Sequence, residues 1–168
     1  MSLATLLVAD LEQEAKNTRK MLEVVPEAKL DWKPHEKSMT LGQLASHLAE
    51  NPSWISAMLE DEMDFATAMT DYKPFAAKNR KELLDGFDKN VRAGLDALRG
   101  RADAFLEKTW TMRNGPKVLM ALPKHQAVRS TGIHHWIHHR GQLTVYLRLL
   151  EVPLPQTYGP TADNPSFG

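Results

Sequence analysis

Apolar residues recur at every third or fourth position in four segments of this 168-residue chain, and no other feature constrains its fold as strongly. This spacing matches the 3.6-residue period of the α-helix, so each segment presents one apolar face. The pattern predicts four helices, at about residues 2–22, 40–59, 79–98 and 123–150. Four amphipathic helices bury these faces most economically against one another, so we expect an all-α four-helix bundle that forms a single domain over residues 1–168.

Residues at the ends of these segments support the helix boundaries. Thr40 and Gln43 have the spacing of a capping box at the start of the second helix. Asn79 and Pro123 are residue types that favour the start of the third and fourth helices. Pro52 cannot donate a backbone hydrogen bond, so we expect a kink or a short break in the second helix at that residue.

The segments between and after the helices differ in character. Residues 61–78 are polar and mixed, and we expect them to form a connection. Residues 107–112 and 117–122 flank Asn114-Gly115, a dipeptide typical of tight hairpin turns. We therefore expect a short hairpin between the third and fourth helices, with a plain loop as the alternative because Pro116 follows the turn. The tail from Val152 to Gly168 contains four prolines and is expected to be extended or irregular.

The balance of charges narrows the range of partners. Lys and Arg number 21, as do Asp and Glu, so the formal net charge is zero and neither nucleic acid nor a membrane is an expected partner. No apolar stretch is long enough to span a bilayer, and the start of the chain lacks the pattern of a secretory signal, so a cytoplasmic protein is expected. Because the chain has no cysteine, a metal site would need histidine and carboxylate ligands.

Four of the seven histidines lie in one six-residue stretch, residues 134–139, of the predicted fourth helix. Residues four apart lie on one face of a helix with Cβ atoms about 5–6 Å apart, close enough for two imidazoles to bind one ion. This spacing gives two candidate pairs, His134 with His138 and His135 with His139. The pairs lie about 100° apart around the helix axis, so they cannot both face the centre of the bundle.

The other residues of the fourth helix decide which pair faces inward. The face of His135 and His139 continues through positions 128, 131, 143, 146, 147 and 150, which are mostly apolar. The face of His134 and His138 continues through positions 130, 141, 145 and 148, which are less apolar. We therefore expect His135 and His139 to point into the bundle and the other two to lie at its flank or in solvent.

A third ligand must come from another helix, because two histidines alone make a weak metal site. His47 is the best candidate, since it lies within the predicted second helix, whereas His35 and His125 lie near the ends of elements and are expected to be solvated. Coordination by three histidines is not the only interpretation. A helical histidine pair is often simply solvated, and a single interior histidine is often a hydrogen-bonded core residue.

Separate stretches of the sequence together resemble a known family. Residues 41–54 read LGQLASHLAENPSW, residues 135–142 read HWIHHRGQ, and residues 151–155 and 158–163 read EVPLP and YGPTAD. The first resembles the second-helix pattern of the DinB (damage-inducible) family, in which a histidine precedes a tryptophan. The second resembles the family's H-x-x-x-H-R-G-Q motif on the last bundle helix, and the others resemble its C-terminal end. The resemblance covers about residues 3–163.

The resemblance carries its own implications for fold, metal and partners. It implies a four-helix bundle in which His47, His135 and His139 bind one divalent metal, commonly zinc or nickel, and these are the histidines that helix phase also favours. It also implies a homodimer. Relatives include transferases and isomerases that use low-molecular-weight thiols, so it implies a small-molecule substrate and a thiol of this kind.

Three histidine ligands leave at least one coordination position open, as in catalytic zinc sites. Such an ion can lower the pKa of a water molecule or bind a substrate thiol as its thiolate. Because the protein has no cysteine, the sulfur would have to arrive with the substrate.

Four residues near the predicted ligands are candidates for a supporting role. Gln142 follows His139 by three residues and is expected to be its hydrogen-bond partner. Arg140 is a candidate to pair with an anionic substrate, with a structural ion pair to another helix as the alternative. Trp54 and Tyr146 are candidates for the wall of a pocket, with the helix core as the alternative.

Two further pairs of residues give weaker expectations. Gly132 and Gly141 cost helix stability, so we expect close packing at both. Tyr158 and Asp163, in the tail, are candidates to cover the opening of the site.

Two classes of function remain open. The first is a metal-dependent enzyme, a thiol S-transferase or a hydrolase acting on a small electrophile or ester, and the second is a non-catalytic metal-binding stress-response protein. Open coordination beside a concave pocket would favour the enzyme. Di-iron chemistry is disfavoured because the sequence has no Glu-x-x-His pair, and a zincin protease is disfavoured because Met39 stands where H-E-x-x-H requires its second histidine.

Overall fold

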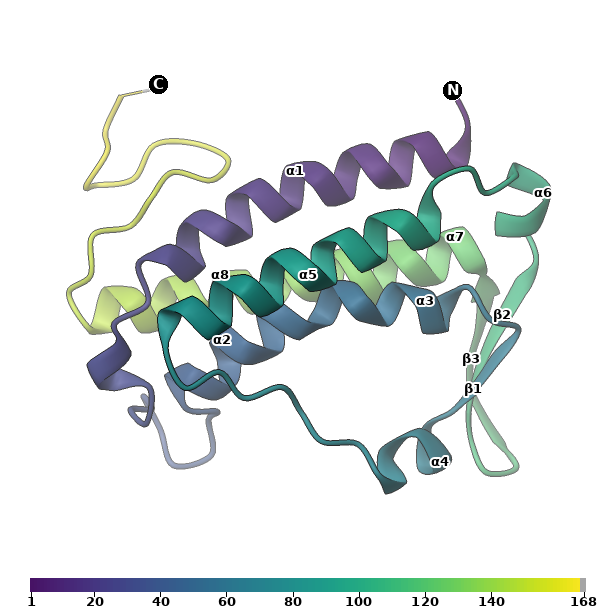
Figure 1. Cartoon of the computed structure of the whole chain (residues 1–168), viewed down its shortest axis with the longest axis horizontal. Helices are drawn as coiled ribbons and strands as arrows, with labels where there is room; N and C mark the ends of the chain where they lie inside the picture. Colours follow the sequence, from purple (N-terminus) through teal and green to yellow (C-terminus); the bar gives the residue numbers. More distant parts are fainter. Residues whose placement is uncertain (167–168) are drawn as a thin grey trace.

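In the computed structural model, which describes residues 1–166, four long helices form a bundle with a small sheet at one end (Figure 1). These helices are α1 (Leu3–Glu23), α2 (Leu41–Glu50), α5 (Arg80–Leu98) and α8 (His135–Leu149). Helix α1 packs against α5 and α8, and α2 packs against the same two helices. The four helices therefore close around one core, which confirms the predicted bundle.

Shorter elements connect and extend these helices. In chain order they are a 3₁₀ turn (Glu27–Lys29), a second 3₁₀ turn (Asn51–Trp54), α3 (Ile55–Met58), β1 (Glu62–Asp64), α4 (Phe65–Thr70), α6 (Asp103–Leu106), β2 (Thr109–Asn114), β3 (Lys117–Pro123), α7 (Lys124–Ala127) and a π-helical segment (Val128–His134). The fold is thus mostly helical but not purely all-α, since it includes a three-stranded sheet.

Side chains cap the starts of the helices as the sequence predicts. The Thr40 hydroxyl accepts a hydrogen bond from the Gln43 backbone N–H at 3.1 Å, and the Gln43 side-chain oxygen accepts one from the Thr40 N–H at 2.8 Å. This reciprocal pair is a capping box. Asn79 caps α5, because its side-chain oxygen accepts from the Glu82 N–H at 2.8 Å. These three bonds satisfy backbone donors that have no partner within a helix.

The predicted break at Pro52 is present. Helix α2 ends at Glu50, a 3₁₀ turn follows over Asn51–Trp54, and α3 continues in nearly the same direction (Figure 1). The backbone of Gly94 on α5 packs directly against this turn, since a Cβ atom at Gly94 would lie 2.6 Å from the Pro52 carbonyl oxygen. Only glycine therefore allows α5 to approach the turn this closely.

The sheet corrects the expectation for residues 61–78. The predicted hairpin is confirmed, because β2 and β3 pair antiparallel around a turn in which Gly115 has a φ of 57°. Residues 61–78 are more than a connection, since they contain β1, which pairs parallel with β2, and the short helix α4. A three-residue strand shows no sequence period of its own, so only its pairing with β2 defines it.

The long helix at the C-terminal side has an irregularity that its sequence does not reveal. Helix α7, the π-helical segment and α8 run continuously from Lys124 to Leu149, which agrees with the predicted fourth helix. The π-helical segment ends at His134, immediately before the first predicted ligand on this helix. Such segments insert an extra residue into an α-helix and often occur at functional sites.

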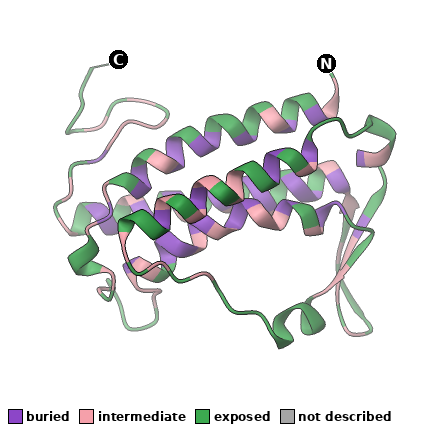
Figure 2. Ribbon diagram, viewed as in Figure 1, coloured by how far each residue is buried: buried purple, intermediate pink, exposed green. Residues whose placement is uncertain are grey.

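Burial follows the helix faces (Figure 2). Along the π-helical segment and α8, the predicted inward face is confirmed at Leu143, Tyr146 and Leu147, which are buried, while the residues at 130, 134, 138, 141, 145 and 148 are exposed. Trp136 is also buried, and its indole N–H donates to the Leu48 carbonyl oxygen of α2 at 2.9 Å. No helix in the described part of the chain is both long and apolar enough to cross a membrane.

Candidate metal centre

Three histidines from two helices meet at one point. The Nε2 atom of His135 on α8 lies 3.2 Å from Nε2 of His47 on α2 and 3.2 Å from Nε2 of His139. The ligand atoms of all three side chains lie within 4.8 Å of one another. Over residues 1–166, this histidine triad is the only group of three or more potential ligands that could hold a metal ion.

The spacing of the nitrogens fits a divalent transition metal. Imidazole nitrogens bind zinc at about 2.0–2.1 Å, so two nitrogens on a tetrahedral ion lie about 3.3 Å apart. The two 3.2 Å separations in the triad are close to this value. Three neutral nitrogen donors with no thiolate also suit zinc or nickel better than calcium or magnesium, which prefer oxygen.

The surroundings of the triad keep its imidazoles neutral. Burial, together with the neighbouring His139 and His135, lowers the pKa of His47 from 6.5 to about 4, and burial has the largest effect. Burial also lowers the pKa values of His135 and His139, and in His139 a hydrogen bond to Gln142 acts in the opposite direction. A neutral imidazole has a lone pair that can bind a metal, so these residues do not have to lose a proton near pH 7.

Gln142 determines which nitrogen of His139 carries the proton. Its side-chain oxygen lies 2.7 Å from Nδ1 of His139, and its side-chain nitrogen lies 3.1 Å from Nε2 of His138. An amide oxygen only accepts hydrogen bonds, so Nδ1 of a neutral His139 must be the protonated nitrogen. Nε2, which faces the other two histidines, then has a free lone pair. The arrangement is the one we expect for a residue that orients a metal ligand.

Trp54 packs against the triad from the 3₁₀ turn that follows α2. Its ring centroid lies 5.1 Å from that of His47 and 6.1 Å from that of His135. The break at Pro52 therefore has a consequence for the site, because the turn that it starts places Trp54, two residues later, beside two of the three histidines. Trp54 is half-buried and forms one wall of the site.

Arg140 does not face the triad. Its guanidinium is buried and lies 2.6 Å from the Glu14 carboxylate on α1, and it also donates to Thr18 and to the Tyr158 hydroxyl, at 3.2 and 2.7 Å. Arg140 therefore forms a structural ion pair with another helix, which was the alternative to pairing with an anionic substrate. Arg140 lies one residue after His139, and a rotation of about 100° per residue turns it toward α1.

The tail does not cover the triad either. Tyr158 donates a hydrogen bond to Glu14 at 2.6 Å and lies against α1, and Asp163 pairs with Arg148 on the exposed side of α8. The expectation that these two residues cover the opening is therefore wrong. The described part of the tail is irregular, as predicted. Tyr146 is buried, and its hydroxyl donates to the Met39 carbonyl oxygen at 3.1 Å, as expected for a core residue.

Gly132 and Gly141 differ in how closely other residues pack around them. Gly132 is buried, and a Cβ atom there would lie 3.4 Å from the sulfur of Met58, an ordinary contact. A Cβ atom at Gly141 would have no neighbour within 4 Å. The expected close packing is therefore absent at Gly141, which lies on the exposed side of α8.

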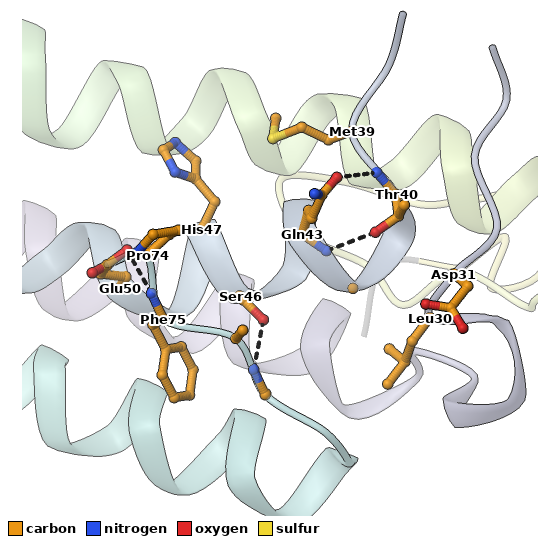
Figure 3. A pocket seen from close by; sticks show the side chains of 13 residues that line it. Leu30, Asp31, Met39, Thr40, Gln43, Ser46, His47, Glu50, Pro74 and Phe75 are labelled. Atoms are coloured by element: carbon orange, nitrogen blue, oxygen red, sulfur yellow. Dashed lines mark hydrogen bonds between the residues drawn. The ribbon is translucent and has the colours of Figure 1, made fainter. Parts of the chain in front are cut away.

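A groove runs along α2 beside the triad (Figure 3). Its volume is about 430 Å³, and it lies between α2, the chain at residues 74–77 and the loop residues 30–31 and 39–40. His47 lines the groove, and in Figure 3 its ring points from α2 toward the pale ribbon of α8. No local pattern in the sequence predicts this groove, because its walls come from separate segments of the chain.

Comparisons with known proteins agree with this architecture. The sequence profile of the DinB family matches residues 1–166. Among solved structures, a DinB-like protein from Bacillus cereus ATCC 10987 is 25% identical, with a TM-score of 0.67 over 90% of this chain and 95% of that one. A DinB-like protein from Bacillus subtilis is 16% identical, with a TM-score of 0.68 over 96% and 99% of the two chains.

A third solved structure, described as a putative member of the DinB family from Exiguobacterium sibiricum 255-15, is 16% identical. It has a TM-score of 0.65 and covers 93% of this chain and 97% of its own. Among proteins of curated function, none matches this chain significantly.

Proposed function

This chain belongs to the DinB family, and on that premise we propose that His47, His135 and His139 hold one zinc or nickel ion at the active site of a metal-dependent enzyme. The observation that carries the proposal is the convergence of three Nε2 atoms from two helices. No carboxylate among the described residues joins the three nitrogens, so a bound ion would keep at least one position for a substrate.

The proposed reaction is the transfer of a small thiol to an electrophile, or the hydrolysis of a small ester. A divalent ion bound by three neutral imidazoles would supply positive charge that favours the thiolate form of a thiol or polarises a carbonyl group. The chain's own residues have separate parts in this proposal. The three imidazoles bind, Gln142 holds the proton of His139 on Nδ1, and Trp54 shields two of the ligands from water.

The metal site is tested by removing one ligand. The His135→Ala protein is expected to bind zinc or nickel at least tenfold more weakly at neutral pH. His134→Ala is a matched control, because His134 immediately precedes His135 in the chain and is exposed. Full metal occupancy of His135→Ala in elemental analysis would remove His135 from the site.

The reaction is tested by screening metal-loaded protein with several low-molecular-weight thiols and a chromogenic electrophile. A rate above background that is lost in His135→Ala would support the enzyme. Absence of any rate with every thiol and ester would favour the second candidate, a metal-binding stress-response protein without turnover.

We also propose that the protein forms a homodimer. Val145 and Leu149 are four residues apart on the outer side of α8 and are each 57% exposed, so they form one apolar strip that a second copy of the chain would cover. Light scattering after size-exclusion chromatography measures the mass directly, and a mass near 18.9 kDa would show a monomer.

A further inference from the structure

The groove along α2 has the size of a small-molecule site. Its volume of about 430 Å³ lies within the range of about 300–1,000 Å³ that is typical of such sites. Phe75, Met39 and Leu30 contribute apolar surface to its walls. Because His47 belongs both to the groove and to the histidine triad, a molecule in the groove would lie beside the metal ligands.

The charged residues of the groove are all acidic. Asp31 and Glu50 line it, and none of its thirteen lining residues is Lys or Arg. The two carboxylates would attract a cation and repel an anion of similar size. A thiol whose body carries carboxylates would therefore bind poorly in this groove.

Glu50 is held in position by the protein while one of its oxygens stays available. Its Oε2 atom accepts hydrogen bonds from the Tyr72 hydroxyl at 2.5 Å and from the Phe75 N–H at 3.4 Å. Both bonds end on the same oxygen, so Oε1 is not used by either. Glu50 follows His47 by three residues in α2, which places the two side chains on neighbouring parts of one helix face.

From this geometry we infer that the groove binds a small molecule with an ammonium group, which Glu50 recognises through a charge-assisted hydrogen bond. The inference rests on the proposed function in one respect: if the triad acts on a thiol, the ligand is an aminothiol. Its sulfur would lie toward His47 and its ammonium group toward Glu50. The thiolate of the ligand would then lie near the positive ion, and its ammonium group would lie near the carboxylates of the groove.

The groove is tested first without metal. The metal-free protein is titrated with butylamine, butanol and butyrate, which have the same length and differ in charge, and backbone amide shifts are followed by NMR. Butylamine is expected to bind at least tenfold more tightly than butyrate and to shift the amides of Ser46, Glu50 and Phe75. Equal binding of butyrate, or shifts confined to other regions, would overturn the inference.

Variants test the role of Glu50. Glu50→Gln removes the charge but keeps an oxygen that accepts from Tyr72, so the fold is expected to persist while butylamine affinity falls about tenfold. Glu107→Gln, at an exposed position outside the groove, is the matched control and should bind like the parent protein. Ala76→Trp fills the groove without changing its charge and should weaken binding of butylamine. Unchanged butylamine affinity in Glu50→Gln would refute recognition by this carboxylate.

The two proposals fail in distinguishable ways. With metal-loaded protein, cysteamine is compared with 2-mercaptoethanol and 3-mercaptopropionate as thiol substrates. Butylamine binding that depends on Glu50, without turnover of any thiol, would leave the inference standing and remove the proposed reaction. Turnover that prefers 3-mercaptopropionate, without butylamine binding, would support the reaction and reject the ammonium site.

Discussion

Replacing Gln142 with leucine tests whether the histidine triad is built to bind a metal. Leucine has a similar size but cannot accept the hydrogen bond that holds the proton of His139 on Nδ1, now made at 2.7 Å. Nε2 of His139 would then carry the proton in part of the population and would have no lone pair for the ion. Loss of such a partner weakens metal binding about 10- to 100-fold, or about 1.4–2.8 kcal/mol.

The assay is a competition titration of zinc against a chromophoric chelator at pH 7, with circular dichroism to verify the fold. Gln142→Glu is the informative companion variant, because its carboxylate still accepts from Nδ1 and should bind zinc at least as tightly as the parent protein. Gln126→Leu, at an exposed position of α7, controls for the added apolar surface.

A second measurement does not need the metal. The hydrogen bond that His139 donates to Gln142 raises the pKa of His139 against the lowering by burial, so Gln142→Leu should lower the midpoint of the His139 proton titration by NMR. Zinc affinity within twofold of the parent protein, together with an unchanged His139 midpoint, would refute the role assigned to Gln142.

Three further predictions concern pH and packing. Because burial and the neighbouring His139 and His135 lower the pKa of His47 from 6.5 to about 4, the unfolded chain takes up a proton at a higher pH than the folded protein does. Urea unfolding of the metal-free protein should therefore show the free energy of unfolding falling by about 1–2 kcal/mol as the pH drops from 6.5 to 4, a value that allows for the partial exposure of His47. Zinc affinity should fall over the same pH range. A free energy of unfolding that does not change over this range would contradict the prediction. Arg140→Met leaves the Glu14 carboxylate buried without its partner, so unfolding should become easier by about 3–5 kcal/mol, and a loss below 1 kcal/mol would show that the pair is not needed. Gly94→Ala should lower the melting temperature, because its Cβ would lie 2.6 Å from a carbonyl oxygen. Gly141→Ala has open space around its Cβ and should raise stability by up to about 1 kcal/mol. Equal effects of the two substitutions would reject this view of the packing.

The sequence alone determined the features that depend on neighbouring residues. The helix faces, the capping box at Thr40, the break at Pro52 and the turn at Gly115 each follow from a few consecutive positions, whose backbone preferences and hydrogen bonds are local. The same is true of the pairing of His135 with His139, since helix geometry fixes the separation of residues four apart.

Only the tertiary structure decided which distant residues meet. His47 reaches His135 across 88 positions of sequence, and Arg140 reaches Glu14 across 126. Periodicity shows which side of a helix is apolar but not which neighbour lies against it, so the triad remained one interpretation among several and Arg140 had two possible partners. The strand β1 and the groove beside Glu50 were not predicted for the same physical reason, since each is formed by contacts between separate segments and leaves no local pattern in any one of them.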